Sequence, residues 1–545
     1  MKNFTKNIIR DTSAWSVATL ALVLVLAIPY LAFASGLLEG TGHKWQHLTT
    51  YFLNKFFVNS IILILGVGFI SCLIGIGTAW VVSRYQFWGR TVLSTLLYLP
   101  LAIPTYIMAY IYVGLLGYGG TTTKLGQWLG IDTVGYNIMN IYGLIWVLSL
   151  SLFPYVYAAA RASFSKRPAA LLETATLLGA SERKYFYSVA LPMAKPAIIG
   201  GLLLVCMEVL NDYGAAKYFG INTFTTGIFR SWTALRDLQS AVYLAGLLIA
   251  FAIVVTLVIR LARGRKSFAS EHDSGAKPER ISVKGYKHFL VFCIAFLPVL
   301  FGLILPIVQL LMWVIPSFDG DSFQRNLVIS LQSFSLAAVA GILTVIMSVA
   351  LLYFSRWNRL PIIKKLPNVS TVGYAIPGAM IGIALFSGGR QLVDFAAESF
   401  DWRIGYLIYG GIPILLYAYV FRFLAVAYYP IEATRLRIGT QLAEAAYTLG
   451  DKKLKALRRV ELPILKPALW AGFLLVFIDT LKELPLTLIL KPYDVNTLAI
   501  VAYTYADEEQ MTKAALPALM LVSLVGLFSF VAMWWQKRAS QKTEQ

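Results

Sequence analysis

Long runs of apolar residues are the feature of this sequence that most restricts its fold. A helix needs about 20 apolar residues to cross a bilayer, and about twelve runs of this order occur along the chain. Hydrophobic residues make up 58% of the 545 positions and charged residues only 14%, whereas soluble domains carry about 25% charged residues. We therefore expect an all-α polytopic membrane protein with about twelve transmembrane helices. The runs lie near 14–38, 56–83, 91–117, 138–164, 197–211, 239–262, 288–316, 327–354, 366–388, 404–428, 468–490 and 514–535.

The first apolar run follows a basic segment that contains Lys2 and Arg10. The sequence Ala32-Phe33-Ala34 near its end resembles a signal-peptidase site, so a cleaved signal peptide is one interpretation. The run is long for the apolar part of a signal peptide and right for a span. We therefore expect it to remain in the protein as an uncleaved signal-anchor helix.

Basic residues are distributed unevenly between the expected loops. The chain has 47 Lys and Arg against 27 Asp and Glu, which gives a net charge of +20. These residues form short blocks between apolar runs rather than one basic face, which argues against nucleic-acid binding. If the N-terminus is cytoplasmic and twelve spans alternate, most Lys and Arg fall in cytoplasmic segments. The positive-inside rule then predicts that both termini are cytoplasmic.

The sequence contains one internal repeat, with a constant offset of 271 residues. The matching positions are Glu173 and Glu444, Ala175 and Ala446, Gly179 and Gly450, Val189 and Val460, and Leu191-Pro192 and Leu462-Pro463. Self-similarity at fixed spacing indicates duplicated structural units. We therefore expect two pseudo-symmetric six-helix halves, residues 1–262 and 288–545. A cytoplasmic linker, residues 263–287, is expected to be too polar to pack and to serve only as a tether.

Each copy of the repeat lies in a long cytoplasmic loop before the fifth span of its half, and it predicts a helix, a turn and a second helix. In the second copy, Gly450 can adopt the left-handed conformation that ends a helix. Asp451 can then cap the next helix, and Pro463 is expected to close it before the span begins. In the first copy the residues expected to take these roles are Gly179, Ser181 and Pro192.

The pattern Glu-Ala-Ala, three residues, Gly, nine residues, Ile or Val, one residue, Leu-Pro resembles the EAA loop of ABC importer permeases. In that family the loop forms a coupling helix that docks into the ATPase subunit, and small residues beside the Glu permit close approach. The pattern occurs in the loops 166–196 and 432–467, with one departure at Thr174, where the family usually has Ala. The resemblance assigns ATPase coupling to Glu173, Ala175, Gly179, Leu191, Pro192, Glu444, Ala445, Ala446, Gly450, Leu462 and Pro463.

The resemblance also implies the rest of an assembly. It implies the type I ABC importer permease fold, a multi-pass position in the bacterial cytoplasmic (inner) membrane, and two copies of a cytoplasmic ABC ATPase subunit as partners. A periplasmic or lipid-anchored binding protein would deliver the substrate. The chain contains no G-x-x-x-x-G-K-[ST] phosphate loop. We therefore expect ATP hydrolysis to reside on separate subunits, and we expect neither enzymatic activity nor a cofactor in this chain.

Segments after the two loops look like those of the fused ferric-iron permeases. These segments are Glu208–Gly214, Phe224–Ile228 and Lys482–Thr487. The resemblance implies that the cargo is Fe3+. Fused permeases for thiamine or 2-aminoethylphosphonate share this layout and stay open as alternatives. A twelve-span secondary transporter is the alternative from another class, although it would not need paired loops of this kind.

Carboxylates lie at or just beyond the fifth span of each half. Glu208 and Asp212 recur as Asp479 and Glu483 at the same offset of 271 residues. Acidic groups at this depth are costly unless they face a polar cavity or a partner, and hard cations such as Fe3+ prefer oxygen ligands. The four carboxylates are therefore candidates to line a substrate path on the pseudo-twofold axis.

Neighbouring residues leave a second interpretation of this cluster open. Tyr213 and Tyr218 could add phenolic oxygens to the path. Lys482 lies among the carboxylates and could neutralise Glu483. The alternative is that these groups pair with one another and only fix the packing of helices.

The sequence offers little for a stable metal site. His43 and His47 have an i, i+4 spacing that would place both rings on one face if the segment were helical. Two ligands alone make no closed site. The three cysteines lie in apolar runs without paired spacing, so they indicate core residues rather than metal ligands or disulfides. We expect no stably bound metal.

Overall fold

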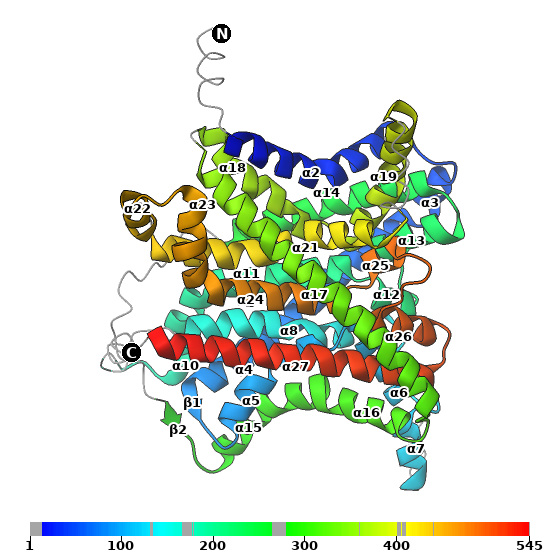
Figure 1. The fold of residues 1–545 in the computed structure, drawn as a ribbon. Coiled ribbons are helices and arrows are strands. Elements are labelled where there is room, and N and C mark those ends of the chain that lie inside the picture. The colour runs from blue at the N-terminus through cyan, green and yellow to red at the C-terminus, as the bar shows by residue number, and fades with distance from the viewer. Residues whose placement is uncertain are drawn as a thin grey trace.

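The computed structural model describes residues 14–130, 135–165, 177, 179–263, 280–358, 360–400, 405, 410–439 and 441–543. Ten helices in these ranges are long and apolar enough to cross a membrane. Two bent pairs of helices raise the number of spans to as many as twelve. The prediction of an all-α polytopic protein with about twelve spans is therefore confirmed (Figure 1).

The first half, up to Arg263, supplies five straight spans and one bent pair. Its elements are α2 (Ala14–Leu38), α3 (Trp45–Tyr51), α4 (Leu53–Arg84), β1 (Tyr85–Gln86), α5 (Arg90–Leu96), η1 (Leu99–Ala102), α6 (Thr105–Leu116), α7 (Thr121–Trp128), α8 (Ile141–Ser165), α10 (Glu182–Tyr185), η2 (Phe186–Ala190), α11 (Leu191–Asn211), α12 (Gly214–Tyr218), α13 (Phe224–Phe229), η3 (Arg230–Ala234) and α14 (Leu238–Arg263).

The second half, from Arg280 onward, has the same plan. Its elements are β2 (Ile281–Ser282), α15 (Tyr286–Val299), η4 (Leu300–Ile304), α16 (Leu305–Val314), α17 (Gly320–Arg356), α18 (Pro361–Ser370), η5 (Thr371–Ala375), α19 (Gly378–Phe400), α21 (Ile412–Ile438), α22 (Gln441–Thr448), α23 (Lys453–Ala456), η6 (Leu457–Glu461), α24 (Leu462–Lys482), α25 (Pro485–Leu490), α26 (Leu498–Asp507) and α27 (Met511–Thr543).

The third span of each half is broken. The helical segment α5–η1 meets α6 at 98°, and α18–η5 meets α19 at 105°. Pro104 and Pro377 stand at the two breaks, and the residue before a proline is forced towards extended backbone. Ile103 and Ile376 accordingly have ψ angles of 112° and 128°. The continuous spans expected over these two runs are therefore wrong, and the polypeptide bends at both Ile-Pro pairs.

The helix that begins after each repeat loop does not end where we expected. Residues 182–211 form one helix, as do residues 453–482. Pro192 and Pro463 occupy the first turn of α11 and α24, and each is preceded by a turn of π-helix, η2 or η6. Such a turn changes the hydrogen-bond register, so proline's missing N–H does not break the helix. The eleventh span does end early, at Lys482, before Pro485 starts α25.

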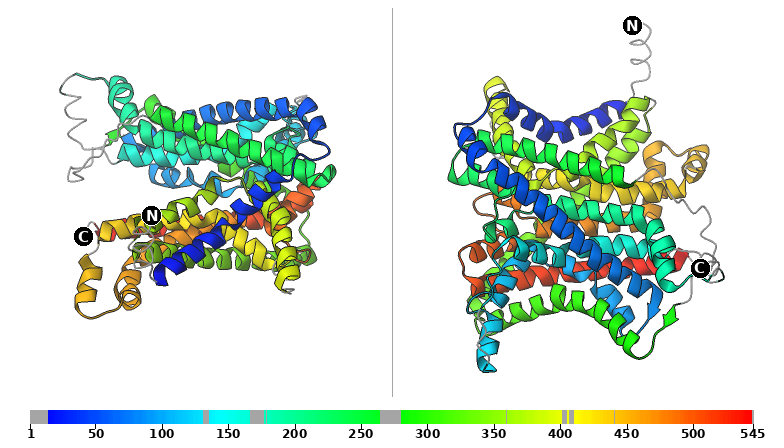
Figure 2. Two further views of the ribbon diagram at one scale, coloured as in Figure 1. Left: turned by 90° about the horizontal axis from the view of Figure 1, so that it is seen from above. Right: turned by 180° about the vertical axis from the view of Figure 1, so that it is seen from behind.

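The first span of each half packs on the other half. Helix α2 contacts α17, α18 and α19, whereas α15 and α16 contact α4, α5 and α6. Trp15 packs on Trp357 with ring centroids 4.5 Å apart, and Tyr112 donates a hydrogen bond of 2.7 Å to the Phe301 carbonyl. The left view of Figure 2 shows α2, in dark blue, on the side of the second half, where it contacts α17, α18 and α19. The two sequence repeats therefore interlock.

The end of the linker is ordered against the first half. Ile281 and Ser282 form β2, which pairs in parallel with Tyr85 and Gln86 of β1. His288 lies beside this pair, with Nε2 3.4 Å from the Trp88 N–H nitrogen. The expectation that the whole linker is too polar to pack is therefore wrong for these residues. Backbone pairing explains the contact, because it does not depend on an apolar side-chain pattern.

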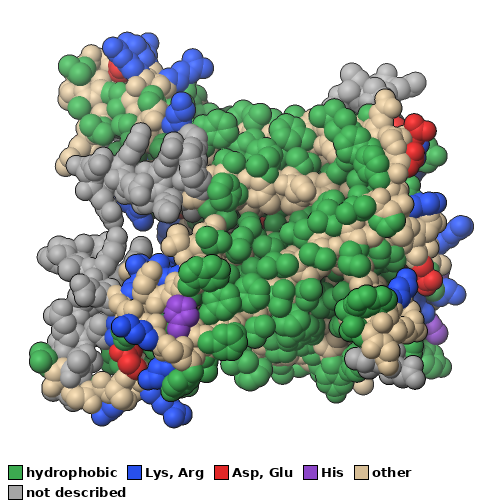
Figure 3. All heavy atoms as spheres, turned by 90° about the horizontal axis from the view of Figure 1, so that it is seen from below, with side chains coloured by type: hydrophobic (Ala, Val, Ile, Leu, Met, Phe, Trp, Pro, Cys, Tyr) green, Lys and Arg blue, Asp and Glu red, His purple; other side chains and the backbone are tan. Residues whose placement is uncertain are grey.

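Charged side chains gather at the ends of the helix bundle. Figure 3 shows apolar side chains over the middle of one face, with Lys and Arg side chains concentrated at its left end. Figure 1 places α10, α22 and α23 at that same end of the molecule. The basic end therefore carries the described parts of both repeat loops.

Candidate functional site

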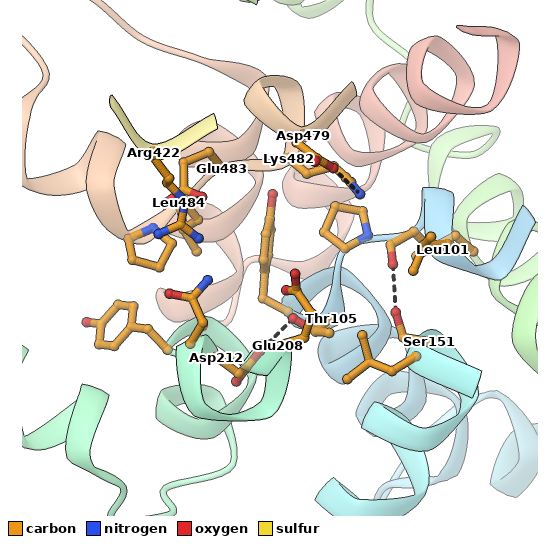
Figure 4. Close-up of a pocket in the computed structure, with 18 of the residues that line it drawn as sticks. Leu101, Thr105, Ser151, Glu208, Asp212, Arg422, Asp479, Lys482, Glu483 and Leu484 are labelled. Carbon is orange, nitrogen blue, oxygen red and sulfur yellow. Dashed lines mark hydrogen bonds and ion pairs between the residues drawn. The ribbon is translucent and has the colours of Figure 1, made fainter. Parts of the chain in front are cut away.

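A cavity of about 110 Å³ lies between the halves, where α11 and α24 end beside the two bends (Figure 4). It is lined by Leu101, Ile103, Pro104, Thr105, Tyr106, Ser151, Leu152, Tyr155, Glu208, Asn211, Asp212, Tyr213, Gly214, Tyr374, Arg422, Phe423, Asp479, Lys482, Glu483, Leu484 and Pro485. The four candidate carboxylates and Tyr213 all line this one cavity, and both halves contribute walls. The fold thus brings together carboxylates that are 271 residues apart in sequence.

Asp212 and Glu483 occupy equivalent positions with the same local structure. Each follows the last residue of its span in an extended conformation, with ψ of 124° and 121°. The Asp212 carboxylate accepts a hydrogen bond of 2.9 Å from the Ala216 N–H, and Glu483 accepts one of 3.0 Å from the Leu486 N–H. Each carboxylate therefore satisfies a backbone donor at the start of the next short helix, α12 or α25.

The partners of these two carboxylates differ. Thr105 donates a hydrogen bond of 2.5 Å to Asp212, whereas Glu483 forms an ion pair of 3.3 Å with Nε of Arg422. The suggested ion pair between Lys482 and Glu483 is wrong. Lys482 instead pairs with Asp479 at 3.3 Å, because these residues lie three positions apart on one helix while Glu483 lies beyond its end.

Glu208 lies on the first-half side of the cavity and interacts with charges of the second half, Lys482 first among them. Tyr155, which also lines the cavity, interacts with the Glu208 carboxylate. The equivalent Tyr419 instead forms a 2.7 Å hydrogen bond with Thr487. The repeat therefore places similar residues at equivalent positions but gives them different partners.

An aromatic contact borders the cavity at Tyr213. Tyr213 stacks on Phe229 with ring centroids 3.7 Å apart. Tyr218, the other suggested phenol, lies away from the cavity, and its hydroxyl lies 3.6 Å from the sulfur of Met511. Only Tyr213 of the two phenols is therefore placed where it can meet a cargo.

Several residues in the cavity wall or directly behind it escaped the sequence analysis. Arg422 is a single basic residue inside the apolar run 404–428, and an ionisable residue within a span is a recognised sign of function. Thr105 and Gly378 directly follow the two Ile-Pro pairs, but neither has a charge or a motif that would mark it. Their importance follows from contacts that only the folded chain reveals.

The structure gives no support to a histidine metal site. Helix α3 starts at Trp45, so His43 precedes it, and His47 packs against Tyr51 with ring centroids 5.0 Å apart. The two rings therefore do not share a helical face. Within the described ranges, no group of three or more His, Cys, Asp and Glu side chains is arranged to hold a metal ion.

The turns of the repeat loops have the conformation that we predicted. Gly179 and Gly450 have φ angles of 71° and 89°, in the left-handed region. Ser181 caps α10 by accepting a 3.3 Å hydrogen bond from the Lys184 N–H. The expected cap by Asp451 is wrong, because that side chain forms an ion pair with Lys455 at 2.6 Å and α23 starts without a side-chain cap.

The surface of the second loop is now defined, whereas Glu173 and Ala175 of the first loop lie outside the described residues. Glu444 and Ala445 on α22 are exposed, and Leu449 beside the turn is 86% exposed. Ala446 is buried, and α22 packs on η6. Ala446 therefore packs inside the loop, and its assigned role in ATPase coupling stays a prediction.

The Leu-Pro pair of each repeat has the same burial in both copies. In each pair the leucine is half-buried and the proline is exposed. These residues are Leu191, Pro192, Leu462 and Pro463.

Both loops are attached to the basic end of the second span of their half. Glu182 forms an ion pair of 2.5 Å with Arg84 at the end of α4. The equivalent Lys453 donates a hydrogen bond of 3.2 Å to the Trp357 carbonyl, just after α17. Arg356 adds an ion pair of 3.0 Å with the buried Glu461. A force on either loop would therefore reach two spans at once.

Comparison with known families gives a match in both halves. Residues 71–265 and 364–545 each match the family described as the binding-protein-dependent transport system inner membrane component. Together the two matches cover well over half of the chain, and each includes one whole repeat loop and two of the cavity carboxylates.

Individual relatives differ in the cargo that their names give. The chain is 24% identical to an Fe(3+)-transport system permease protein of Haemophilus influenzae, over 84% of this chain and 86% of the relative. It is 30% identical to a molybdenum transport system permease protein of the same organism, over 27% of this chain and 64% of the relative. It is 25% identical to a probable sulfate transport system permease protein of Chlorella vulgaris, over 40% of this chain and 82% of the relative.

Proposed function

The chain belongs to the family of binding-protein-dependent transport system inner membrane components, as a fused two-domain permease of an ABC importer, and we propose that its cargo is ferric iron. An extracytoplasmic binding protein delivers the ion. Hydrolysis of ATP on separate subunits drives the ion through the cavity between the halves.

The charge of the cavity supports this choice of cargo. Four carboxylates line it, and the cations among its lining residues are Arg422 and Lys482. With all groups ionised, the lining has more negative than positive charge, which repels oxyanions such as molybdate and sulfate and attracts a cation. Oxygen ligands also suit a hard trivalent cation. The relative that aligns with 84% of this chain has Fe(3+) in its name.

The two repeat loops are the proposed docking sites for two copies of the ATPase subunit. Exposed Glu444 and Ala445, the left-handed turn at Gly450 and the exposed Leu449 form a projecting surface at the basic end of the bundle. The ion pairs at Arg84 and Arg356 offer a route from this surface into the spans. Glu173, Ala175 and Gly179 take the same role in the first loop.

We assign the basic end of the bundle to the cytoplasm. The concentration of Lys and Arg at this end supports this orientation through the positive-inside rule. Both termini are then cytoplasmic, in a multi-pass protein of the bacterial inner membrane, and the boundaries 1–262, 263–287 and 288–545 separate the halves from the linker. The cavity would open to the other side during delivery.

Uptake by cells that carry the whole transport operon tests the proposed cargo. Accumulation of 55Fe3+ should exceed that of labelled thiamine and of 99Mo-molybdate, and it should disappear when the ATPase gene is deleted. Uptake of thiamine but not of iron would assign the carboxylates to an organic cation. Uptake of molybdate would overturn the electrostatic reasoning.

A further inference from the structure

The two halves contribute equivalent carboxylates to the cavity, but only the second half contributes cations. In the second half, Asp479 and Glu483 are held in ion pairs with Lys482 and Arg422. Neither Glu208 nor Asp212 forms an ion pair with a Lys or Arg of the described chain, although the charge of Lys482 acts on Glu208. The repeat places Asn211 where the second half has Lys482. Upstream of the loops the offset is shorter, because Tyr155-Val156-Tyr157 corresponds to Tyr419-Val420-Phe421, so Ala158 stands where the second half has Arg422. Both cations therefore belong to one wall (Figure 4).

Two neighbouring differences between the halves create this asymmetry together. A Cβ atom at Gly378 would collide with Nη1 of Arg422 and would lie 2.6 Å from Oε1 of Glu483. Gly378 is therefore needed to admit the ion pair. In the first half, Thr105 occupies the position of Gly378, and its hydroxyl donates to Asp212 in place of an arginine. The first half thus has Thr105 and Ala158 at the positions where the second half has Gly378 and Arg422.

Each wall also has a buried polar atom without a hydrogen-bond partner, and these two atoms support the same asymmetry. The hydroxyl of Tyr106, a side chain only 5% exposed, lines the cavity beside Thr105 and has no hydrogen-bond partner among the described residues. A buried hydroxyl without a partner is unfavourable. Binding of the transported ion by the hydroxyl oxygen would explain why the site has this hydroxyl. On the opposite wall, Nη1 of the buried Arg422 also lacks a partner there and presents positive charge.

We infer that the cation contacts the first-half wall of the cavity, through Glu208, Asp212 and the Tyr106 hydroxyl, and that Arg422 keeps it away from Glu483. This inference rests on the proposed function, in which the cargo is a hard cation. It replaces the expectation that all four carboxylates take equal parts. Arg422 acts here as a positioning residue, because it shapes the field on the ion without binding it.

The two walls can be compared by removing charge from each. The complex in proteoliposomes, with its binding protein, is assayed for 55Fe3+ uptake and for binding-protein-stimulated ATP hydrolysis. Asp212→Asn retains an oxygen that can accept from Ala216, and it should lower uptake by at least about tenfold. Arg422→Ala with Glu483→Gln removes a neutral ion pair without leaving a buried charge, and it should lower uptake less. Equal losses in the two variants would overturn the inference.

A rescue experiment tests the same inference in the opposite direction. Gly378→Thr with Arg422→Ala copies the first-half arrangement around Glu483. Added to Asp212→Asn, these changes should raise 55Fe3+ uptake above that of Asp212→Asn alone. Unchanged uptake in a complex that still binds and hydrolyses ATP would contradict the inference. If the triple variant does not fold, the comparison of the two walls decides. Absence of iron uptake by the wild type would instead refute the proposed function.

Discussion

Gly450 offers a test of the coupling loop in which strain is separated from steric clash. Its φ angle is 89°, a region that β-branched residues rarely adopt. A Cβ at this position would meet nothing within 4 Å, so Gly450→Val changes the backbone preference and not the packing. Strain of this kind is worth about 1–3 kcal/mol. If docking requires the turn and the undocked loop can relax, binding of the ATPase should weaken by about 5- to 150-fold.

Gly40 provides a matched control at the opposite end of the protein. Its φ angle is 91°, and it too has nothing within 4 Å of an added Cβ. Gly40→Val should therefore impose similar strain without affecting the ATPase. Gly450→Asn is the second control, because Asn tolerates the left-handed region. Co-purification of the ATPase and the rate of ATP turnover are measured for all three variants. Wild-type values for Gly450→Val, or equal losses for Gly40→Val, would refute the coupling assignment.

Three further predictions follow from other contacts. Lys452→Ser supplies the cap that α23 lacks and should stabilise the second loop by about 0.5–2 kcal/mol, measured as a higher Tm. Cleavage at a protease site inserted between residues 263 and 280 should leave transport largely intact, since β2 would stay joined to α15; loss of uptake on clean cleavage would show that the linker does more than connect. Burial raises the pKa of Asp237, but hydrogen bonds from the Ser240 and Lys44 N–H groups outweigh it and hold the pKa below its usual value. Asp237→Asn should therefore lower the Tm at pH 7, and the difference from wild type should vanish as the pH falls through the lowered pKa.

The features that sequence predicted well are those set by local composition. Apolar runs gave the spans, because a helix in lipid must be apolar over its whole length. The repeat gave the left-handed turns at Gly179 and Gly450, since glycine is favoured there for a local reason. The carboxylates at Glu208 and Asp479 were identified because charge at that depth is rare.

The features that sequence did not predict depend on contacts between distant residues. Arg422 meets Glu483 only because two helices and the Gly378 bend converge, and no local pattern records this. The packing of α2 on the second half likewise follows from tertiary structure. The helix ends near Pro192 and Pro463 were misjudged for a different reason, since a π-helical turn can accommodate a proline that would otherwise end a helix.

Transport by the purified complex tests the central claim most directly. The permease, its ATPase and its binding protein are reconstituted in proteoliposomes, and 55Fe3+ accumulation is followed with and without ATP inside. The account predicts accumulation that requires ATP hydrolysis and the binding protein, and that fails when the ATPase is omitted. Iron uptake driven by an ion gradient in the absence of ATPase subunits would contradict it, because the chain would then be a secondary transporter.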